Sequence, residues 1–340
     1  MVWIKFLLSV AIILFAGMKA TRYADVIAER TGLGRIWIGL LLLGLVTSMP
    51  ELITGVSSVA LVGEAGVPDL GLGTLLGSCV FNLSILGILD VLHRDGPILN
   101  QVSMRHMASA GVGILLFTTA VLGIGFGEKF SGLALGWVDA SSVIILVLYL
   151  LGTWWIFHSE RSRHLSLIPD SHSPAKESPV VNWLWLKFVM AALAIIVAGV
   201  WLSFVGDEIA ETTQWNTSFV GSLLLAVATS MPELVVAISA LRLGAVDLAV
   251  ADVLGANMLD VAYVFVLDLF YTENFILSSV SDVHMISAII AGVMSLLVIM
   301  GLRFRRKRKT FIVISWYGLL LIGLYIFGAY ALFTSGIAPG

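Results

Sequence analysis

One six-residue string occurs twice in this 340-residue chain, and it combines two hydroxyls, a proline and a carboxylate. Thr47–Leu52 reads TSMPEL, and the same letters return unchanged at Thr229–Leu234. In a helix, each proline lacks the amide hydrogen that the carbonyl four residues earlier would accept, so the string also frees backbone oxygens. Carboxylate, hydroxyl and carbonyl oxygens are the ligands that hard cations prefer. The repeated string therefore predicts a cation-binding site.

A second pair of matching segments follows the two copies of the string. Residues 69–82 contain DL and then GSCVFN, and residues 247–260 contain DL and then GANMLD, with the same spacing inside each segment. Asp90 is matched by Asp268, which follows its segment at the same distance along the chain. The chain therefore contains two copies of one unit.

The composition sets the surroundings of these polar groups. Hydrophobic residues make up 59% of the chain, charged residues make up only 12%, and the mean hydropathy is +1.01. Ordinary soluble domains have about 25% charged residues, so a soluble enzyme and a nucleic-acid-binding protein are excluded. The single cysteine, Cys79, excludes a disulfide framework and a zinc cluster.

Continuous apolar runs, each long enough to cross a bilayer, predict an all-α membrane protein. Their continuity excludes a transmembrane β-barrel, whose strands alternate with a period of two. Ten transmembrane helices are expected, at residues 3–18, 36–62, 70–92, 107–126, 133–157, 181–205, 217–241, 247–271, 283–302 and 311–333.

The basic residues predict the orientation in the membrane. If the N-terminus lies outside, every lysine and arginine except Lys5 and Lys129 falls in a cytoplasmic segment. The first apolar run is therefore expected to be a span and not a signal peptide. We expect a multi-pass protein of the inner membrane of the cell, with both termini outside. The polar segment 159–180 is expected to be a cytoplasmic linker between two five-helix repeats, 1–158 and 181–340.

Because five is an odd number, the second repeat must enter the membrane from the opposite side. Inverted repeats of this kind are typical of secondary transporters, whose substrate binds near the midplane between the repeats. The two motif regions, 44–90 and 226–268, are expected to meet there. The side chains at matching positions in these regions are Thr47, Ser48 and Glu51, then Thr229, Ser230 and Glu233, then Ser78 and Asn82, then Ala256 and Asp260.

A less specific interpretation of the repeated string is a capping box, with Ser48 as the helix cap and Glu51 three residues later. Two copies deep inside apolar runs favour function, because an ionisable group within a span is costly and usually functional. Asp90 and Asp268 are about 12 Å further along their helices, and we expect them nearer the membrane interface. The six histidines are expected to be solvated at span ends or in the linker. The role of Asp252 stays open.

The paired strings, with GSxxxN in the first copy and GxNxxD in the second, resemble the two alpha-repeats of the cation/calcium antiporter superfamily, in its sodium/calcium exchanger branch. The resemblance covers essentially the whole chain. It implies exchange of Ca²⁺ for Na⁺ by alternating access, in which the first and sixth helices slide across the other eight. It implies no enzymatic activity and no cofactor. The expected partners are Ca²⁺, Na⁺ and the lipid bilayer, without nucleic acid, and the chain is expected to be a monomer.

The resemblance also implies roles for individual residues. The central Ca²⁺ ligands would be Glu51 and Glu233, with the carbonyls of Thr47 and Thr229. The Na⁺ ligands would be the hydroxyls of Thr47, Ser48, Thr229, Ser230 and Ser78 and the carbonyls of Gly44 and Ala226. The residues that complete the set would be Asn82 and Asp260.

Four positions depart from the pattern of this family. Ala256 replaces a serine and removes one hydroxyl from an expected Na⁺ site. Asparagine is replaced at the positions of Cys79, Thr74 and Asp252. Coupling to H⁺ and co-transport of K⁺ therefore stay open as alternatives. The inverted repeat disfavours a cation channel. An intramembrane aspartyl protease is disfavoured because this sequence lacks the GxGD string that such an enzyme would need.

Charge counting makes Asp260 the asymmetric member of the expected site. Three carboxylates, those of Glu51, Glu233 and Asp260, around one divalent ion would leave a surplus negative charge inside the membrane. The first copy has the neutral Asn82 at the matching position. We expect either that Asp260 is protonated when Ca²⁺ is bound or that a monovalent cation accompanies Ca²⁺.

Overall fold

The computed structural model describes residues 1–31, 45, 47–62, 67–130, 136–164, 179–306 and 308–335. This part of the chain is helical and contains no β-strand, in agreement with the predicted all-α class. The long helices are α1 (Val2–Thr31), α3 (Met49–Ala60), α4 (Pro68–Leu92), α5 (His106–Phe130), α6 (Ala140–His164), α7 (Pro179–Thr213), α10 (Met231–Arg242), α11 (Val246–Phe270), α13 (Val283–Arg303) and α14 (Trp316–Ser335). The short helical segments are η1 (Ile98–Asn100), α8 (Thr217–Phe219), η3 (Val220–Leu225), α9 (Ala226–Thr229) and α12 (Ile276–Ser279).

Within the described residues, eight helices are long and apolar enough to cross a membrane. A ninth span results if the bent pair Thr217–Thr229 and Met231–Arg242 is counted as one. These spans coincide with nine of the ten predicted ones. The predicted second span, 36–62, begins in residues outside the described part of the chain, and its second half contains α3.

Several helices are longer than the apolar runs that predicted them. The first helix continues to Thr31, well past the predicted end at residue 18. Both helices beside the predicted linker extend into it, because α6 ends at His164 and α7 begins at Pro179. Apolar runs mark only the segment that matches the lipid core, whereas the helix continues into more polar sequence beyond it. Residues 165–178 of the linker lie outside the described residues.

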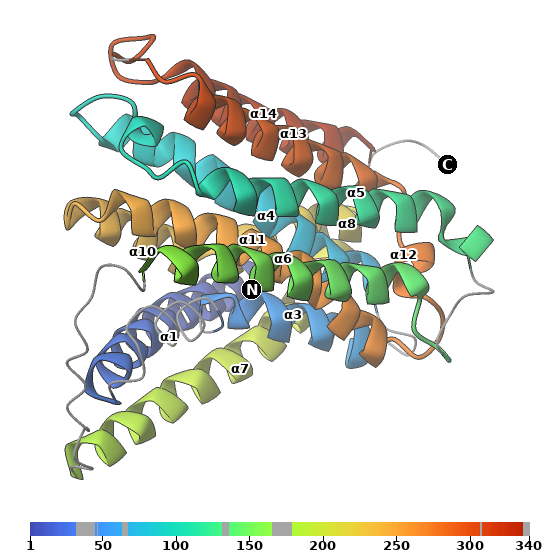
Figure 1. Ribbon diagram of the computed structural model, residues 1–340. Helices are drawn as coiled ribbons and strands as arrows, with labels where there is room; N and C mark the ends of the chain where they lie inside the picture. Colours follow the sequence, from blue (N-terminus) through green and yellow to red (C-terminus); the bar gives the residue numbers. More distant parts are fainter. Residues whose placement is uncertain are drawn as a thin grey trace.

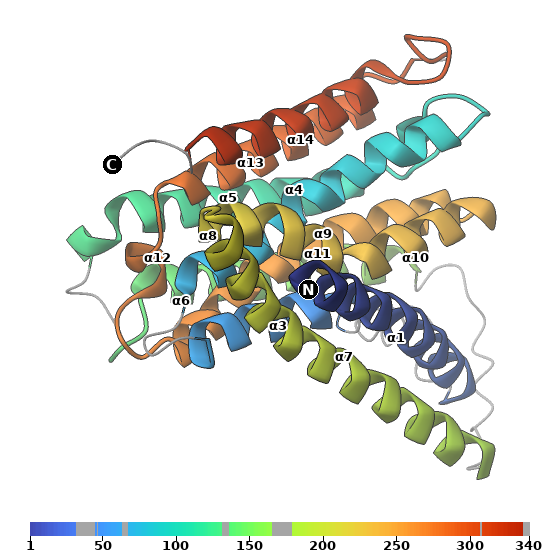
Figure 2. The same ribbon diagram turned by 180° about the vertical axis from the view of Figure 1, so that it is seen from behind.

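The helices are arranged around α4 and α11, which lie side by side at the centre (Figure 1). Both are largely buried along their length, and such helices are apolar all round rather than amphipathic. Figures 1 and 2 show α13 and α14 together at one edge of the molecule, and α1 and α7 together at the opposite edge. The motif helices α3 and α10 therefore lie between the central pair and the pair α1 and α7.

The seventh predicted span is a broken helix. Its first half consists of α8, η3 and α9, and η3 is a π-helix of six residues. A bend of 42° then separates this half from α10. Ser230 lies at the bend with φ −84° and ψ 9°, and Ser48 of the first string has φ −84° and ψ 7°. The two strings thus have the same backbone conformation, and Pro50 and Pro232 stand in the first turn of the next helix, where proline is tolerated.

Asp90 and Asp268 fix the ends of α4 and α11. Both carboxylates are completely buried. They accept hydrogen bonds from backbone amides, those of Ile98 (2.9 Å) and Ser315 (2.6 Å) for Asp90 and those of Ile276 (2.8 Å) and Asp139 (2.7 Å) for Asp268. The partners Ile98 and Ile276 also occupy matching positions in the two copies. These two aspartates therefore attach the chain that leaves each central helix to the end of that helix.

Two other aspartates bind histidines at the opposite ends of the same helices. Asp69 accepts a 2.9 Å contact from Nε2 of His284, and Asp247 accepts a 3.0 Å contact from Nε2 of His106. The imidazole of His284 is completely buried, and that of His106 is 11% exposed. The expectation that all six histidines are solvated is therefore wrong for these two, and it is also wrong for His93, which is 8% exposed and contacts the Gly96 carbonyl. Each of these two histidines, His284 and His106, lies in the first turn of its own helix and contacts an aspartate in the first turn of a neighbouring span.

Candidate cation-binding site

The carboxylates of the two repeated strings lie in the first turns of α3 and α10. Glu51 and Glu233 are both completely buried. The partial positive charge of a helix N-terminus stabilises a carboxylate at this position. Neither Ser48 nor Ser230 caps its helix through its side chain. The capping-box interpretation therefore does not hold, and both serine hydroxyls are free of that role.

A hydroxyl of the second string contacts the carboxylate of the first. Ser230 Oγ donates a 2.8 Å hydrogen bond to Glu51 Oε1, although the two residues are 179 positions apart. The other oxygen of Glu51 and both carboxylate oxygens of Glu233 have no hydrogen-bond partner among the described residues. The two strings therefore meet inside the protein.

The third span contributes a hydroxyl to the broken seventh span. Ser78 Oγ donates to the Ala226 carbonyl at 3.4 Å and lies 3.5 Å from Thr229 Oγ1. Thr229 Oγ1 itself donates to the carbonyls of Leu225 (3.0 Å) and Ala226 (3.2 Å). The oxygens of three residues predicted from the sequence therefore lie close together, those of Ser78, Ala226 and Thr229.

Other site residues predicted from the sequence have buried polar groups without a hydrogen-bond partner among the described residues. Asn82, Asp260 and Ser48 are completely buried. The amide group of Asn82, both carboxylate oxygens of Asp260 and the hydroxyl of Ser48 have no hydrogen-bond partner among the described residues. A buried polar group without a partner is costly, and folded proteins keep few of them. Their concentration on α4, α11 and the start of α3 indicates a place built to bind a polar or charged ligand.

The three carboxylates do not converge on one point in this conformation. Within the described part of the chain, no three aspartate, glutamate, histidine or cysteine side chains could hold one metal ion. The arrangement of Glu51, Glu233 and Asp260 around a divalent ion stays a prediction. In this conformation Glu51 accepts a hydrogen bond from Ser230. Thr47 of the first string is buried, and Gly44 lies outside the described residues.

Comparison with known proteins gives the family. The sequence model described as sodium/calcium exchanger protein matches residues 1–158 and 183–334, which is most of the chain. This chain belongs to the sodium/calcium exchanger family. The members of this family are transporters and not enzymes, so the chain is a membrane transporter of the antiporter type.

Relatives of this exchanger-family chain are distant in sequence. It is 27% identical to the inner membrane protein YrbG of Escherichia coli over 74% of each chain. It is 22% identical to an uncharacterized membrane protein of Methanocaldococcus jannaschii over 94% of each chain. Among solved structures, the sodium–calcium exchanger NCX_Mj is similar in fold, with a TM-score of 0.62 at 20% identity over 97% of this chain and 99% of that chain.

In this exchanger-family chain, the departures from the family pattern lie in or beside the site. Ala256, the counterpart of Ser78, is buried and offers no side-chain oxygen. Cys79 and Asn257, which occupy matching positions in the two copies, bind each other. The Asn257 amide donates to the Cys79 carbonyl at 3.1 Å, and the Cys79 thiol donates to the Asn257 carbonyl at 3.6 Å. Asn257 is the asparagine of the GxNxxD string, but the sequence did not predict a role for it in the site.

Asp252 adds a fourth buried carboxylate two turns before Asp260 on α11. It is 5% exposed, and its Oδ2 has no hydrogen-bond partner among the described residues. Its counterpart in the first copy, Thr74, is neutral and donates to the Leu70 carbonyl at 2.8 Å. The two copies of the exchanger motif therefore differ most in charge on α11.

Proposed function

We propose that this chain exchanges Ca²⁺ for Na⁺ across the membrane by alternating access. The single observation that carries the proposal is the contact between Ser230 and Glu51, which joins the two copies of one oxygen-rich string in the buried interior. Carboxylate, hydroxyl and carbonyl oxygens together suit hard cations. Membership of the exchanger family supports Ca²⁺ and Na⁺ as the transported ions.

In this proposal neighbouring oxygens of one site serve the two ions in turn. Glu51 and Glu233 replace water around Ca²⁺, together with backbone carbonyls beside the two helix breaks. Na⁺ uses the neutral oxygens that already lie together, namely the hydroxyls of Ser78 and Thr229 and the carbonyl of Ala226. The carboxylates converge when a divalent ion compensates their repulsion. Because the two sets of ligands lie in one site, a bound cation of one kind repels a cation of the other kind, and this couples the two fluxes.

We further propose that the two halves of the chain are inverted five-helix repeats, 1–158 and 181–340, joined by the cytoplasmic linker 159–180. Support comes from contacts that recur at matching positions of the two copies, such as Asp69 with His284 and Asp247 with His106. The connections 93–105, 243–245 and 308–315 lie at one end of the molecule, as the predicted alternation requires (Figures 1 and 2). The proposed orientation places both termini outside the inner membrane.

Alternating access is supported by the way α1 and α7 are attached. These two helices pack extensively on each other and form their own edge of the molecule (Figure 2). Their ends are joined by an ion pair of 2.6 Å between Lys5 and Glu208. A pair of helices that is tied together and lies against the motif helices is suited to slide as one body.

The experiment that tests the proposal is Ca²⁺ uptake into proteoliposomes under imposed Na⁺, K⁺ or H⁺ gradients. We expect uptake that saturates with Ca²⁺ and is driven by an outward Na⁺ gradient. Uptake driven only by H⁺, or uptake that requires K⁺ on the Ca²⁺ side, would replace Na⁺ coupling by one of the two alternatives. Flux that needs no counter-ion gradient and does not saturate would identify a channel and overturn the proposal.

A further inference from the structure

The helix starts of α4 and α11 are tied to neighbouring spans by two matched junctions. Asp69 accepts hydrogen bonds from the Ser281 amide (2.8 Å) and from His284 Nε2 (2.9 Å). Asp247 accepts hydrogen bonds from the Ser103 amide (2.6 Å) and from His106 Nε2 (3.0 Å). The aspartate, the serine and the histidine of one junction match those of the other in residue type and in repeat position. A substitution at one junction can therefore be compared with the equivalent substitution at the other junction.

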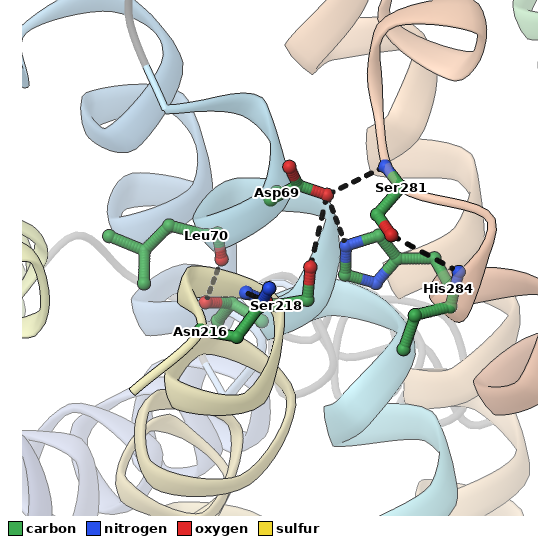
Figure 3. Close-up of polar contacts among 8 residues, drawn as sticks. Asp69, Leu70, Asn216, Ser218, Ser281 and His284 are labelled. Atoms are coloured by element: carbon green, nitrogen blue, oxygen red, sulfur yellow. Dashed lines mark hydrogen bonds and ion pairs between the residues drawn. The ribbon is translucent and has the colours of Figure 1, made fainter. Parts of the chain in front are cut away.

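Within the described part of the chain, one junction has a third partner that the other lacks. Ser218 Oγ donates a 3.1 Å hydrogen bond to Asp69 Oδ1, which is the same oxygen that Ser281 and His284 contact (Figure 3). When the two TSMPEL strings are aligned, the position in the first copy that matches Ser218 is Ile36. An isoleucine side chain has no donor. The Asp247 junction therefore cannot form this bond from the matching position.

Ser218 belongs to the start of the broken seventh span. It lies in α8, where Asn216 Oδ1 accepts its amide hydrogen at 2.7 Å and fixes the helix start. The π-helix η3 follows directly and carries the chain to Ala226 and Thr229 of the candidate site. A displacement of α8 and η3 would therefore displace oxygens that we assign to the ions.

The rest of the contact between η3 and α4 combines a close approach of the two backbones with buried apolar side chains, those of Leu70, Val220 and Leu225. A Cβ at Gly221 would lie 2.6 Å from the Leu70 carbonyl oxygen, and a Cβ at Gly77 would lie 2.2 Å from the Ser222 carbonyl oxygen. Glycine permits this close approach because it has no side chain. The hydrogen bond from Ser218 to Asp69 adds a directional polar attachment at the end of this contact.

The surroundings strengthen the bond at Asp69. Its side chain is 27% exposed, against 58% for Asp247, and its histidine partner is completely buried. Hydrogen bonds to a charged acceptor in less polar surroundings are stronger than those in water. Three donors on one carboxylate oxygen also fix its position.

We propose that Asp69 is a positioning residue of the transport cycle, which holds α8 and η3 against α4 through Ser218 and so keeps the site closed from the outside. His284 and Ser281 of α13 and its preceding turn hold Asp69 in place. Among the residues that the structure describes, the matching junction at Asp247 makes no such contact with a broken span. The proposal rests on the proposed antiporter cycle and adds to it a named closing contact.

Labelling of a cysteine at the contact tests this without any transported ion. Ser222→Cys places a thiol beside Gly73, and its initial rate of reaction with a membrane-impermeant maleimide is measured on sealed proteoliposomes. Cys79 is completely buried, and the chain without Ser222→Cys gives the background. We expect Ser218→Ala to raise the labelling rate about tenfold, and Asp69→Asn to raise it at least as much. Ser218→Thr keeps the hydroxyl and should restore the slow rate.

Asp247→Asn is the matched control and should leave the labelling rate unchanged. If Ser218→Ala does not accelerate labelling, or if Asp247→Asn accelerates it equally, the proposal is wrong. If Asp69→Asn fails to fold, Ser218→Ala and Ser218→Thr still decide the question, because they leave the contacts of Asp69 with α13 intact. The labelling rates do not depend on which ions are transported. The experiment can therefore contradict the proposal for Asp69 without contradicting the proposed function, and the reverse also holds.

Discussion

Ser230 donates a hydrogen bond of 2.8 Å to Glu51, whereas the hydroxyl of Ser48 and the carboxylate of Glu233 have no hydrogen-bond partner among the described residues. The two strings have identical sequences and the same backbone conformation at their serines. The difference therefore arises from what surrounds each copy, and it leaves one glutamate held and the other unpaired. Asp260 and Ala256 are two further points at which the copies differ.

The first prediction concerns the charge of Asp260. In Asp260→Asn we expect Ca²⁺ exchange to persist with a weaker dependence on pH, because the matching Asn82 indicates that a neutral amide fits this position. The measurement is Ca²⁺ uptake at several pH values. Loss of uptake at every pH in a folded variant would contradict this expectation. A sharp fall in coupling to Na⁺ or K⁺ alone would assign a monovalent cation to Asp260.

The second prediction concerns the hydroxyl missing at Ala256. Ala256→Ser should steepen the Na⁺ dependence of exchange or lower the Na⁺ concentration for half-maximal rate, since it restores an oxygen at the position that matches Ser78. Ser78→Ala is the matched change in the other copy and should act in the opposite direction. The measurement is the rate of exchange over a series of Na⁺ concentrations. An unchanged curve for Ala256→Ser would mean that the position is outside the site or that water supplies the ligand.

The third prediction concerns the contact of α1 and α7 with the motif helices. Gly17 and Gly199 occupy matching positions in the two copies, and a Cβ on them would lie 2.8 Å from Pro232 Cγ and 3.0 Å from Ile53 Cγ2, respectively. Overpacking at such a contact costs about 1–3 kcal/mol. Gly17→Ala should therefore slow exchange about tenfold, and more than Gly199→Ala, because a proline ring cannot move aside as an isoleucine side chain can.

Gly111→Ala is the control for this pair, since a Cβ there would have no neighbour within 4 Å. Initial rates of Ca²⁺ uptake are compared at equal amounts of reconstituted protein, with melting temperatures to confirm folding. A Gly17→Ala variant with the normal rate would show that α1 does not move against Pro232 during transport.

The fourth prediction concerns stability rather than transport. Asp90→Asn should lower the free energy of unfolding by about 2–4 kcal/mol. The reason is that the carboxylate accepts hydrogen bonds from Ile98, Ser315 and Tyr317. The NH₂ group of an asparagine cannot accept a hydrogen bond, so at least one of these donors would lose its acceptor. Asp282→Asn, at an exposed position, should change stability by less than about 0.5 kcal/mol. Thermal unfolding in detergent compares the two, and equal melting temperatures would show that the Asp90 contacts contribute little.

Features that depend on nearby residues could be predicted from the sequence, and features that depend on distant partners could not. Apolar runs mark spans, and a serine and proline in the TSMPEL string mark a helix break, because each acts within one or two turns. The π-helix Val220–Leu225 has an ordinary apolar sequence, and its conformation accompanies the close contact of Gly221 and Ser222 with α4. The pairing of Asp69 with His284 joins residues 215 positions apart. The repeat could have indicated it, since Asp, Ser and His recur together in both copies.

The most direct test of the central claim is equilibrium binding of Ca²⁺ to the purified chain, with and without Na⁺. The account predicts saturable Ca²⁺ binding that Na⁺ displaces competitively. It also predicts that Glu51→Gln and Glu233→Gln each weaken this binding by at least about 100-fold, roughly 3 kcal/mol, in protein that still folds and inserts. Glu211→Gln, a carboxylate change outside the site, should bind Ca²⁺ normally. Full Ca²⁺ affinity in either glutamate variant, or Ca²⁺ binding that Na⁺ does not displace, would contradict the account.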